Sequence, residues 1–416
     1  MKSKFFLNQP ARRSESALPP PTRAPLAFHR RLPGYQPTPL IDAPELAHML
    51  GIGQVLVKDE SKRLGLPAFK ILGASWAVYR ALEKRAAEAT DGCAGKPGRC
   101  FASDTAARPG LPAASPSGIF EPWSTVEELA ERLASLKPLT LVTATDGNHG
   151  RGVAHVAALF GFGARILVPA GTAEARIDGI ASEGALVEVV DGTYDDAVLR
   201  AAREANNRSL VISDTSWPGY EAIPRWVMEG YSTMLWEIDD ELARLGKKDA
   251  DLLVVPVGVG ALAAAIVRHY CDRKPNESPK ILSVEPLHAA CMIAAMEAGE
   301  IVTVPGPHDS IMAGLNCGRV SITAWPIVST GIDAFIAISD ERAREAMRAL
   351  ARVGIVAGET GAASLAGLIE LLTGSESAHH RTDLGITERS RALVLATEGA
   401  TDPAAYERVV GKWPQA

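Results

Sequence analysis

The stretch LTLVTATDGNHGRGVAHVAALFG, residues 139–161, joins an apolar run, a glycine-containing polar loop and an amphipathic segment. The run at 139–145 has the composition of a buried strand, and the segment from 151 onward has the spacing of a helix. The loop between them, within Thr143–Gly152, holds an acid, an amide, an imidazole, a guanidinium and three glycines. A strand that leads through such a loop into a helix is typical of a ligand-binding turn in an α/β protein.

The same alternation of strands and helices extends along most of the chain. Helix-forming stretches such as 73–89, 152–162 and 340–354 separate the apolar runs. The pattern therefore predicts an α/β fold of two doubly wound domains with mostly parallel sheets, in which ligands lie beyond the carboxyl ends of the strands. The runs predicted to be strands are 54–60, 139–145, 164–170, 186–192, 210–216, 251–258, 280–286, 335–340 and 391–399.

Composition limits the classes of function. The chain has 416 residues, of which 47% are hydrophobic and 22% charged, as expected for a globular protein with room for two domains. Its net charge of -6 gives no indication of a nucleic-acid partner. No apolar run approaches the ~20 residues that a membrane span requires, and the N-terminus lacks the apolar core of a signal peptide. We therefore expect a cytoplasmic protein without a membrane partner.

Cysteine usage argues against a disulfide framework and a zinc site. The five cysteines are an odd number in a large chain, and none has zinc-finger spacing. We therefore predict no metal site.

The predicted domain organisation has four parts. A loosely ordered leader covers residues 1–30, and a large domain combines 31–84 with 241–416. The small domain covers 85–240 and carries an exposed insertion at about 91–123, because that segment is rich in Gly, Pro, Ala and Ser. Ser124 followed by Glu127 predicts a capping box at the start of the next helix.

Lys70 stands where a strand-following loop meets a helix, in the stretch AFKILGASWA. The dipole at a helix N-terminus disfavours a cation, which helps a lysine to become the neutral amine that a Schiff base requires. A solvated cation at a helix start explains the same pattern, since most lysines are exposed. The flanking Phe69 and Ile71 favour a more apolar setting.

A glycine-rich turn lies in VVPVGVGALAAAIV, residues 254–267, between an apolar strand and a small-residue helix. Backbone N–H groups that Gly258 and Gly260 expose at a helix start form an anion site, typically for phosphate. The stretch lacks the third glycine of a dinucleotide fingerprint and the lysine of a P-loop. Tight packing of the helix on the sheet explains the glycines equally well.

The DGNHG loop offers polar groups to a flat ligand. Its glycines allow close approach of the backbone, and the amide of Asn148 can donate to a ring oxygen. Asp146 is suited to act as a base or to bind an ammonium group. An N-cap aspartate with turn glycines would explain Asp146 and one glycine, but not the whole cluster.

These motifs together carry a resemblance. AFKILG, DGNHG, the glycine-rich turn and ATEGATD, in this order, resemble the tryptophan synthase β-subunit class of pyridoxal-phosphate enzymes, known as fold type II. RLGLPAFK, TATDGNHGRGVAH, DTSWPGYEAIPRWVMEGY, VGVGA and ATEGATD are more narrowly similar to the 2,3-diaminopropionate ammonia-lyases. The similarity covers about residues 35–403; the leader and the 91–123 insertion depart from it.

The resemblance implies a pyridoxal 5'-phosphate cofactor in the cleft between the two domains, and a role for each matching residue. Lys70 would hold the cofactor through its side-chain amine, and Asn148 would contact the ring oxygen. Thr397, in ATEGATD, would contact the ring nitrogen as a neutral partner. Asp214 matches an acidic active-site position of the lyases. Residues that would bind the phosphate are Gly258, Val259, Gly260 and Ala261.

Asp146 and Asp214 favour a diamino acid as the substrate. A second ammonium group complements two carboxylates, whereas a serine or threonine dehydratase binds a neutral hydroxyl. We therefore expect elimination of 2,3-diaminopropionate to pyruvate and ammonia, with Lys70, Asp146 and Asp214 as catalytic residues. The alternative enzyme is a serine/threonine dehydratase or a lyase for another β-substituted amino acid.

Three further expectations stay open to test. A catalytically inactive relative that keeps the fold as a binding module is the non-enzyme alternative, against which the intact Lys70 argues. A homodimer is expected, since dimers are the commonest oligomers. The stretch Gly358–Gly367 either lies near the cofactor, with Glu359 close to its ring, or packs as a plain helix.

Overall fold

The computed structural model describes residues 3–8, 20–91, 121–271, 278–411 and 413. Most of the 91–123 insertion lies outside these residues, and so do Cys93 and Cys100. The strands are β1 (Lys4–Leu7), β2 (Leu40–Asp42), β3 (Gln54–Asp59), β4 (Thr140–Ala144), β5 (Gly163–Pro169), β6 (Leu186–Val190), β7 (Ser209–Val211), β8 (Leu252–Pro256), β9 (Lys280–Pro286), β10 (Ala334–Ile338) and β11 (Arg391–Ala396).

Helices connect and cover the strands. They are α1 (Ala24–His29), α2 (Pro44–Leu50), α3 (Lys70–Asp91), α4 (Val126–Leu133), α5 (Asn148–Phe160), α6 (Glu174–Ala181), α7 (Tyr194–Ala202), α8 (Ala222–Arg244), α9 (Ala261–Cys271), α10 (Cys291–Ala298), α11 (Trp325–Gly331), α12 (Asp340–Arg352), α13 (Ala363–Thr373), α14 (Ser377–Leu384) and α15 (Pro403–Val410). Single 3-10 turns occur at η1 (Ala134–Leu136), η2 (Leu287–Ala289) and η3 (Ala313–Leu315).

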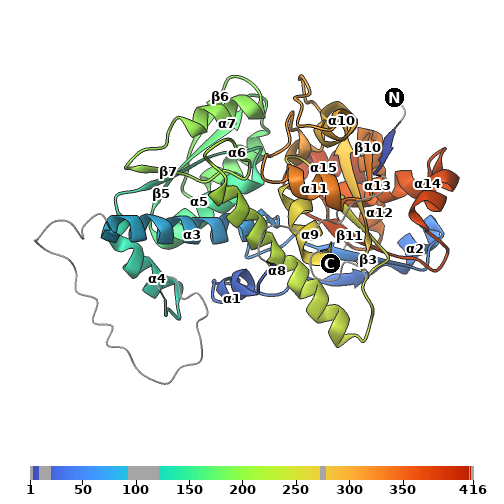
Figure 1. Cartoon of the computed structure of the whole chain (residues 1–416), viewed down its shortest axis with the longest axis horizontal. Coiled ribbons are helices and arrows are strands. Elements are labelled where there is room, and N and C mark those ends of the chain that lie inside the picture. The colour runs from blue at the N-terminus through green and yellow to red at the C-terminus, as the bar shows by residue number, and fades with distance from the viewer. Residues whose placement is uncertain (1–2, 9–19, 92–120, 272–277, 412, 414–416) are drawn as a thin grey trace, which may run out of the picture.

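The strands form two sheets, which confirms the predicted α/β class with mostly parallel sheets (Figure 1). The larger sheet has seven strands in the order β1-β10-β9-β8-β11-β3-β2. Its five inner strands are parallel, and the edge strands β1 and β2 pair antiparallel with β10 and β3. The smaller sheet has the order β6-β5-β4-β7 and is parallel throughout.

Helices bury both faces of the larger sheet, which explains its continuous apolar strands. Leu252 and Val254 of β8 belong to the core formed with α12 and α13, whereas Leu253 and Val255 point into the core shared with α9. Successive residues of one strand point to opposite faces, so apolar side chains are needed at every position, as is typical of a parallel sheet.

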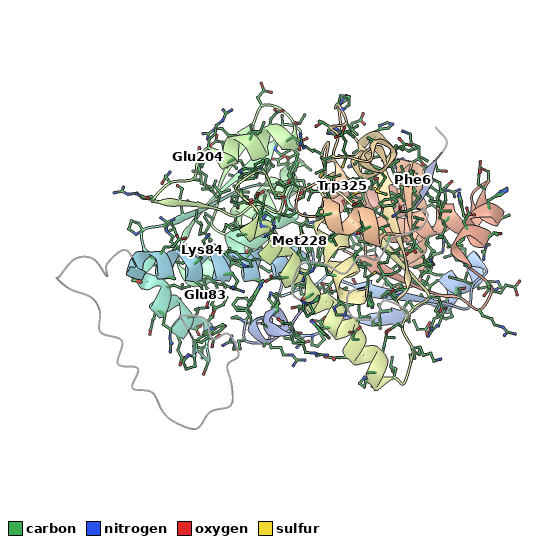
Figure 2. The ribbon with its side chains drawn as sticks, in the orientation of Figure 1. Phe6, Glu83, Lys84, Glu204, Met228 and Trp325 are labelled. Atoms are coloured by element: carbon green, nitrogen blue, oxygen red, sulfur yellow. The ribbon has the colours of Figure 1, made fainter. Side chains whose placement is uncertain are left out.

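The long helices α3 and α8 pack on each other, and Met228 of α8 is buried in the core at this contact (Figure 2).

Parts of the leader at 1–30 are regular elements. Lys4–Leu7 forms β1, and the ring of Phe6 packs edge to face on Phe335 of β10, with ring centroids 6.1 Å apart (Figure 2). Ala24–His29 forms α1, in which Leu26 and Phe28 are buried. The sheet edge and the core order these two segments, and neither of those contacts can be seen in the local sequence.

The strands divide between the sheets where the predicted domains divide, since β4–β7 all come from within 85–240. The boundaries at 84/85 and 240/241 fall inside α3 and α8 and stay a prediction. The predicted capping box of α4 was placed one residue early. Thr125 is the N-cap and accepts from the Glu128 N–H, while the Glu128 carboxylate accepts from the Ser124 N–H at 2.7 Å.

Candidate functional site

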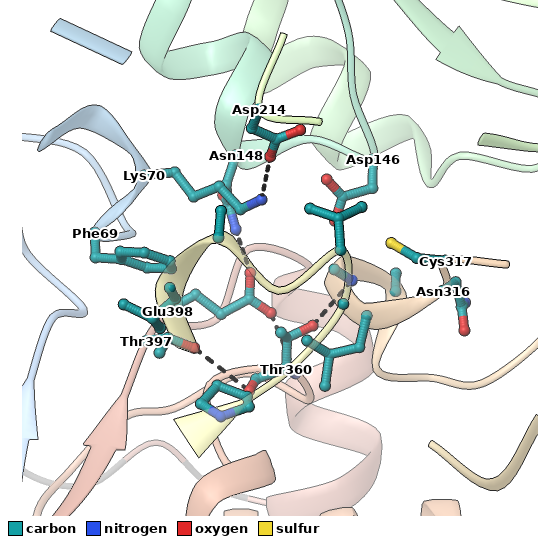
Figure 3. A pocket seen from close by; sticks show the side chains of 18 of the residues that line it. Phe69, Lys70, Asp146, Asn148, Asp214, Asn316, Cys317, Thr360, Thr397 and Glu398 are labelled. Atoms are coloured by element: carbon teal, nitrogen blue, oxygen red, sulfur yellow. Dashed lines mark hydrogen bonds and ion pairs between the residues drawn. The ribbon is translucent and has the colours of Figure 1, made fainter. Parts of the chain in front are cut away.

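A central pocket opens at the carboxyl ends of strands from both sheets, the expected position for a ligand in an α/β fold. All nine residues that the sequence singled out line it, and they follow β3, β4, β7, β8 and β11 (Figure 3). The complete lining is Phe69, Lys70, Asp146, Asn148, Tyr194, Asp214, Tyr231, Pro256, Gly258, Val259, Gly260, Ala261, Leu262, Ala313, Gly314, Leu315, Asn316, Cys317, Thr360, Thr397 and Glu398.

Lys70 is the first residue of α3 and lies in this pocket. The preceding loop is fixed to the end of β11, because the Phe69 N–H donates to the Thr397 carbonyl at 3.2 Å. The Lys70 amine donates to the Asp214 carboxylate at 2.7 Å (Figure 3). The Lys70 side chain is 19% exposed and that of Asp214 is 4% exposed, so this pair is partly shielded from water.

The electrostatics of Lys70 differ from the expectation based on its helix position. Burial lowers the pKa of the Lys70 amine, but the charges of Asp214, Tyr231 and Asp146, together with the hydrogen bond to Asp214, outweigh it. The pKa of Lys70 therefore lies well above its ordinary value. Its position at a helix N-terminus therefore does not make Lys70 neutral, because the negative groups around the amine favour its charged form.

Asp214 is held as a carboxylate. Burial raises the pKa of Asp214, but the charge of Lys70 and hydrogen bonds from Lys70 and Tyr194 lower it well below its ordinary value. Tyr194 begins α7 and donates from its hydroxyl to Asp214 at 3.0 Å. Burial also raises the pKa of the Tyr194 hydroxyl well above its ordinary value, so this group donates as a neutral phenol.

The DGNHG loop holds Asp146 and Asn148 over the pocket. Gly147 has φ +149°, which favours glycine, and α5 begins at Asn148. The Thr145 hydroxyl accepts from the N–H groups of Gly147 and Gly150 at 2.9 and 3.0 Å, which fixes the turn. Lys70 and Asp146 enter the pocket from different sides (Figure 3).

The turn at Gly258–Ala261 lies between β8 and α9. Among the described residues, no hydrogen bond uses the backbone N–H groups of Gly258, Val259, Gly260 or Ala261. Gly260 has φ +99°, and a Cβ there would lie 3.1 Å from Ala324 and from Met292. Packing therefore accounts for part of the glycine requirement, while the free N–H groups at the start of α9 provide an anion site.

Thr397 and Glu398 follow β11 and close the pocket from the side of the larger sheet. The Thr397 hydroxyl is buried and donates to the Thr360 carbonyl at 3.5 Å. Glu398 is 1% exposed, and its carboxylate accepts from the Asn148 side-chain amide (Figure 3).

Sequence reasoning missed several pocket residues. Glu398 lies inside the ATEGATD motif and Tyr231 ends the DTSWPGYEAIPRWVMEGY motif, so both had a usable signal, whereas nothing local marks Tyr194. The segment Ala313–Cys317 also lines the pocket, and its glycine-containing sequence is the only hint of a turn. In the stretch from Gly358, Thr360 lines the pocket and Glu359 is not among the lining residues.

Other chemical features of the described chain are few. Cys271, Cys291 and Cys317 are buried, and the thiols of Cys291 and Cys317 are free. Within the described ranges, His, Cys, Asp and Glu side chains form no group of three or more that could hold a metal ion. None of the described helices is both long enough and apolar enough to span a bilayer.

Comparison with known proteins defines the class. The family model described as "Pyridoxal-phosphate dependent enzyme" matches residues 123–382, more than half of the chain. The chain belongs to this family of pyridoxal-phosphate dependent enzymes.

Its relatives are more specific. The chain is 35% identical to a diaminopropionate ammonia-lyase of Salmonella typhimurium over 92% of this chain and 90% of that protein. A crystal structure of diaminopropionate ammonia lyase from Escherichia coli in complex with D-serine has a TM-score of 0.83 and 32% identity, covering 98% of this chain and 97% of that one. The same enzyme in complex with an aminoacrylate-PLP azomethine reaction intermediate gives a TM-score of 0.81 at 31% identity and the same coverage.

Proposed function

We propose that this chain catalyses the pyridoxal-phosphate dependent elimination of 2,3-diaminopropionate. The reaction consumes one water and releases one pyruvate and two molecules of ammonia, one from the β-nitrogen and one from the α-nitrogen. The observation that carries the proposal is that Asp214 binds an ammonium group, that of Lys70, at 2.7 Å in a pocket that also contains Asp146. Extensive similarity to diaminopropionate ammonia-lyases supports it.

The residues of the pocket fit the cofactor. Pyridoxal phosphate needs an amine, an anion site for its phosphate and polar contacts for its ring. Lys70 supplies the amine, and the unused N–H groups of Gly258, Val259, Gly260 and Ala261 supply the anion site. Asn148 and Thr397 would contact the ring. When bound, the cofactor accepts the electron pair that remains after the α-proton leaves the substrate.

Each catalytic side chain has a distinct proposed task. The Lys70 amine takes the α-proton on its own side of the substrate, and Asp146 can do so on the other side. Asp214 binds the β-ammonium, because it already binds the chemically equivalent ammonium of Lys70. The Tyr194 hydroxyl, at 3.0 Å, keeps the Asp214 carboxylate directed into the pocket.

A selectivity measurement tests this assignment. In Asp214→Asn, kcat/KM for 2,3-diaminopropionate should fall at least about tenfold further than kcat/KM for serine, equal to ~1.4 kcal/mol of selective transition-state stabilisation. The reason is that serine brings no charge at its β-position. Equal losses for the two substrates would mean that Asp214 does not recognise the β-ammonium, and a parent enzyme that prefers serine would favour a dehydratase.

We further infer that the enzyme is a homodimer and works in the cytoplasm. The prevalence of closed dimers among soluble oligomers supports the homodimer. Light scattering on the purified protein measures the dimer directly, and a mass of one chain would contradict it.

A further inference from the structure

The Glu398 carboxylate connects the two sheets across the pocket. It follows β11 of the larger sheet, where the Thr360 N–H donates to its Oε1 at 3.3 Å. Its Oε2 accepts from the side-chain amide of Asn148, which begins α5 after β4 of the smaller sheet (Figure 3). The side chain is 1% exposed, so its hydrogen bonds are made inside the protein rather than to bulk water.

Arg176 supplies the cation that faces this buried carboxylate. It lies on α6, and its guanidinium is 3.9 Å from Glu398 Oε1 with a side chain 8% exposed. Burial lowers the pKa of Arg176, but the charges of Glu398, Asp146 and Glu359 outweigh it, so the net shift is upward. The same guanidinium donates to the Asp146 carbonyl at 3.5 Å. Arg176 therefore links Glu398 to the loop that contains both Asp146 and Asn148.

A carboxylate partner fixes which way the side-chain amide of Asn148 points. The amide of Asn148 has an oxygen that only accepts and a nitrogen with two N–H donors, whereas an ionised carboxylate only accepts. The amide nitrogen must therefore face Glu398. Because that nitrogen has a second N–H, the same orientation leaves one donor for another acceptor.

We propose that Glu398 is a positioning residue for the cofactor. By fixing the direction of the Asn148 amide, it makes Asn148 present an N–H rather than its oxygen to the anionic ring oxygen of pyridoxal phosphate. With Arg176, it also holds the loop of Asp146 and Asn148 against the end of β11, where Thr397 lies. This inference rests on the proposed function, since it assigns Glu398 a task within the same cofactor site.

A double-mutant cycle on cofactor binding tests the inference. The proteins are the full-length parent, Glu398→Gln, Asn148→Ala and the double variant, each freed of cofactor and titrated with pyridoxal phosphate. Glu398→Gln keeps the shape of the side chain but can donate as well as accept, so it no longer fixes the amide. We expect its dissociation constant to rise about tenfold, and the double variant to bind no more weakly than Asn148→Ala.

Two further variants separate positioning from a structural role. Glu359→Gln removes another buried acid that faces Arg176 but does not line the pocket, and its dissociation constant should stay within about twofold of the parent value. Glu398→Asp keeps the charge near Arg176 but withdraws the carboxylate from Asn148, so it should weaken binding as Glu398→Gln does. The absorption band of the bound cofactor should shift in both Glu398 variants and not in Glu359→Gln.

The outcomes distinguish this inference from the proposed function. Additive losses in the double variant, or parent-like affinity and absorption in both Glu398 variants, would overturn the positioning role and leave the proposed function intact. A parent protein that binds no pyridoxal phosphate would overturn the proposed function itself. If Glu398→Gln does not fold, Glu398→Asp provides the same comparison with Asn148→Ala.

Discussion

The Lys70 amine and the Asp214 carboxylate lie 2.7 Å apart, although 144 positions separate them in the chain. Lys70 follows β3 of the larger sheet, and Asp214 follows β7 of the smaller one. The pair therefore exists only when both sheets place the carboxyl ends of their strands at one pocket.

Lys70→Ala should abolish the absorption band of covalently bound pyridoxal phosphate and reduce turnover below detection. Lys70 is the amine that reaches into the pocket from α3, and alanine offers no nitrogen to bond to the cofactor. Absorption spectra and pyruvate assays measure both effects. Borohydride trapping followed by peptide mapping should label Lys70 in the parent; a label on another lysine would contradict the assignment.

Gly260→Ala should weaken retention of the cofactor by about tenfold, equal to ~1.4 kcal/mol. A Cβ at this position would lie 3.1 Å from Ala324 and Met292, and its φ of +99° also disfavours alanine, so the turn must shift. Gly354→Ala is the matched control, because Gly354 has φ +80° with no atom within 4 Å of its Cβ position. Equal dissociation constants for both variants would assign the Gly260 turn to packing alone.

Asp146→Asn should reduce turnover of D-2,3-diaminopropionate by about 100-fold or more, with a much smaller effect on the L isomer. Lys70 and Asp146 enter the pocket from different sides (Figure 3), and the two isomers present their α-protons to opposite sides. Lys70 should serve the L isomer and Asp146 the D isomer. Steady-state kinetics on the separate isomers measure the contrast, and equal losses would indicate that Asp146 binds the substrate instead.

Glu285 should make folding stability depend on pH. Burial raises the pKa of Glu285 from its ordinary 4.5 to about 8, although N–H groups of Met292 and Ile293 oppose this shift. The folded state therefore binds a proton that the unfolded state has lost between these two values. The stabilisation is fully present below pH 4.5 and is lost as the pH rises through about 8.

Glu285→Gln should remove this pH dependence. In the parent, the free energy of unfolding should fall by on the order of 1 kcal/mol per pH unit between pH 4.5 and about 8. Denaturant unfolding of both proteins at several pH values gives the difference in slope. The exposed Glu131 provides the control, since Glu131→Gln should keep the slope of the parent. Parallel curves for the parent and Glu285→Gln would show that Glu285 does not titrate in this range.

The sequence predicted much of the fold because the parallel strands are long apolar runs. All nine predicted runs overlap a strand, β3 to β11. It missed β1 and β2, which are short antiparallel edge strands of four and three residues. Such strands depend on pairing with a distant partner, which a local pattern does not contain.

The candidate site divides in the same way. Lys70, Asp146 and the glycine turn stand in local motifs that follow strands, so the sequence could predict them as site residues. The contact of Asn148 with Glu398 and that of Tyr194 with Asp214 join residues from different elements. The raised pKa of Lys70 also depends on a contact between different elements, the one with Asp214, so the sequence could not predict it.

The most direct test of the account is a pyruvate-release assay over β-substituted amino acids of both hands, with ammonia measured in the same samples. We predict that 2,3-diaminopropionate is the best substrate by kcat/KM and that each pyruvate is accompanied by two molecules of ammonia, one from each substrate nitrogen. Pyruvate formation from serine or another β-substituted amino acid, with none from either isomer of 2,3-diaminopropionate, would contradict it.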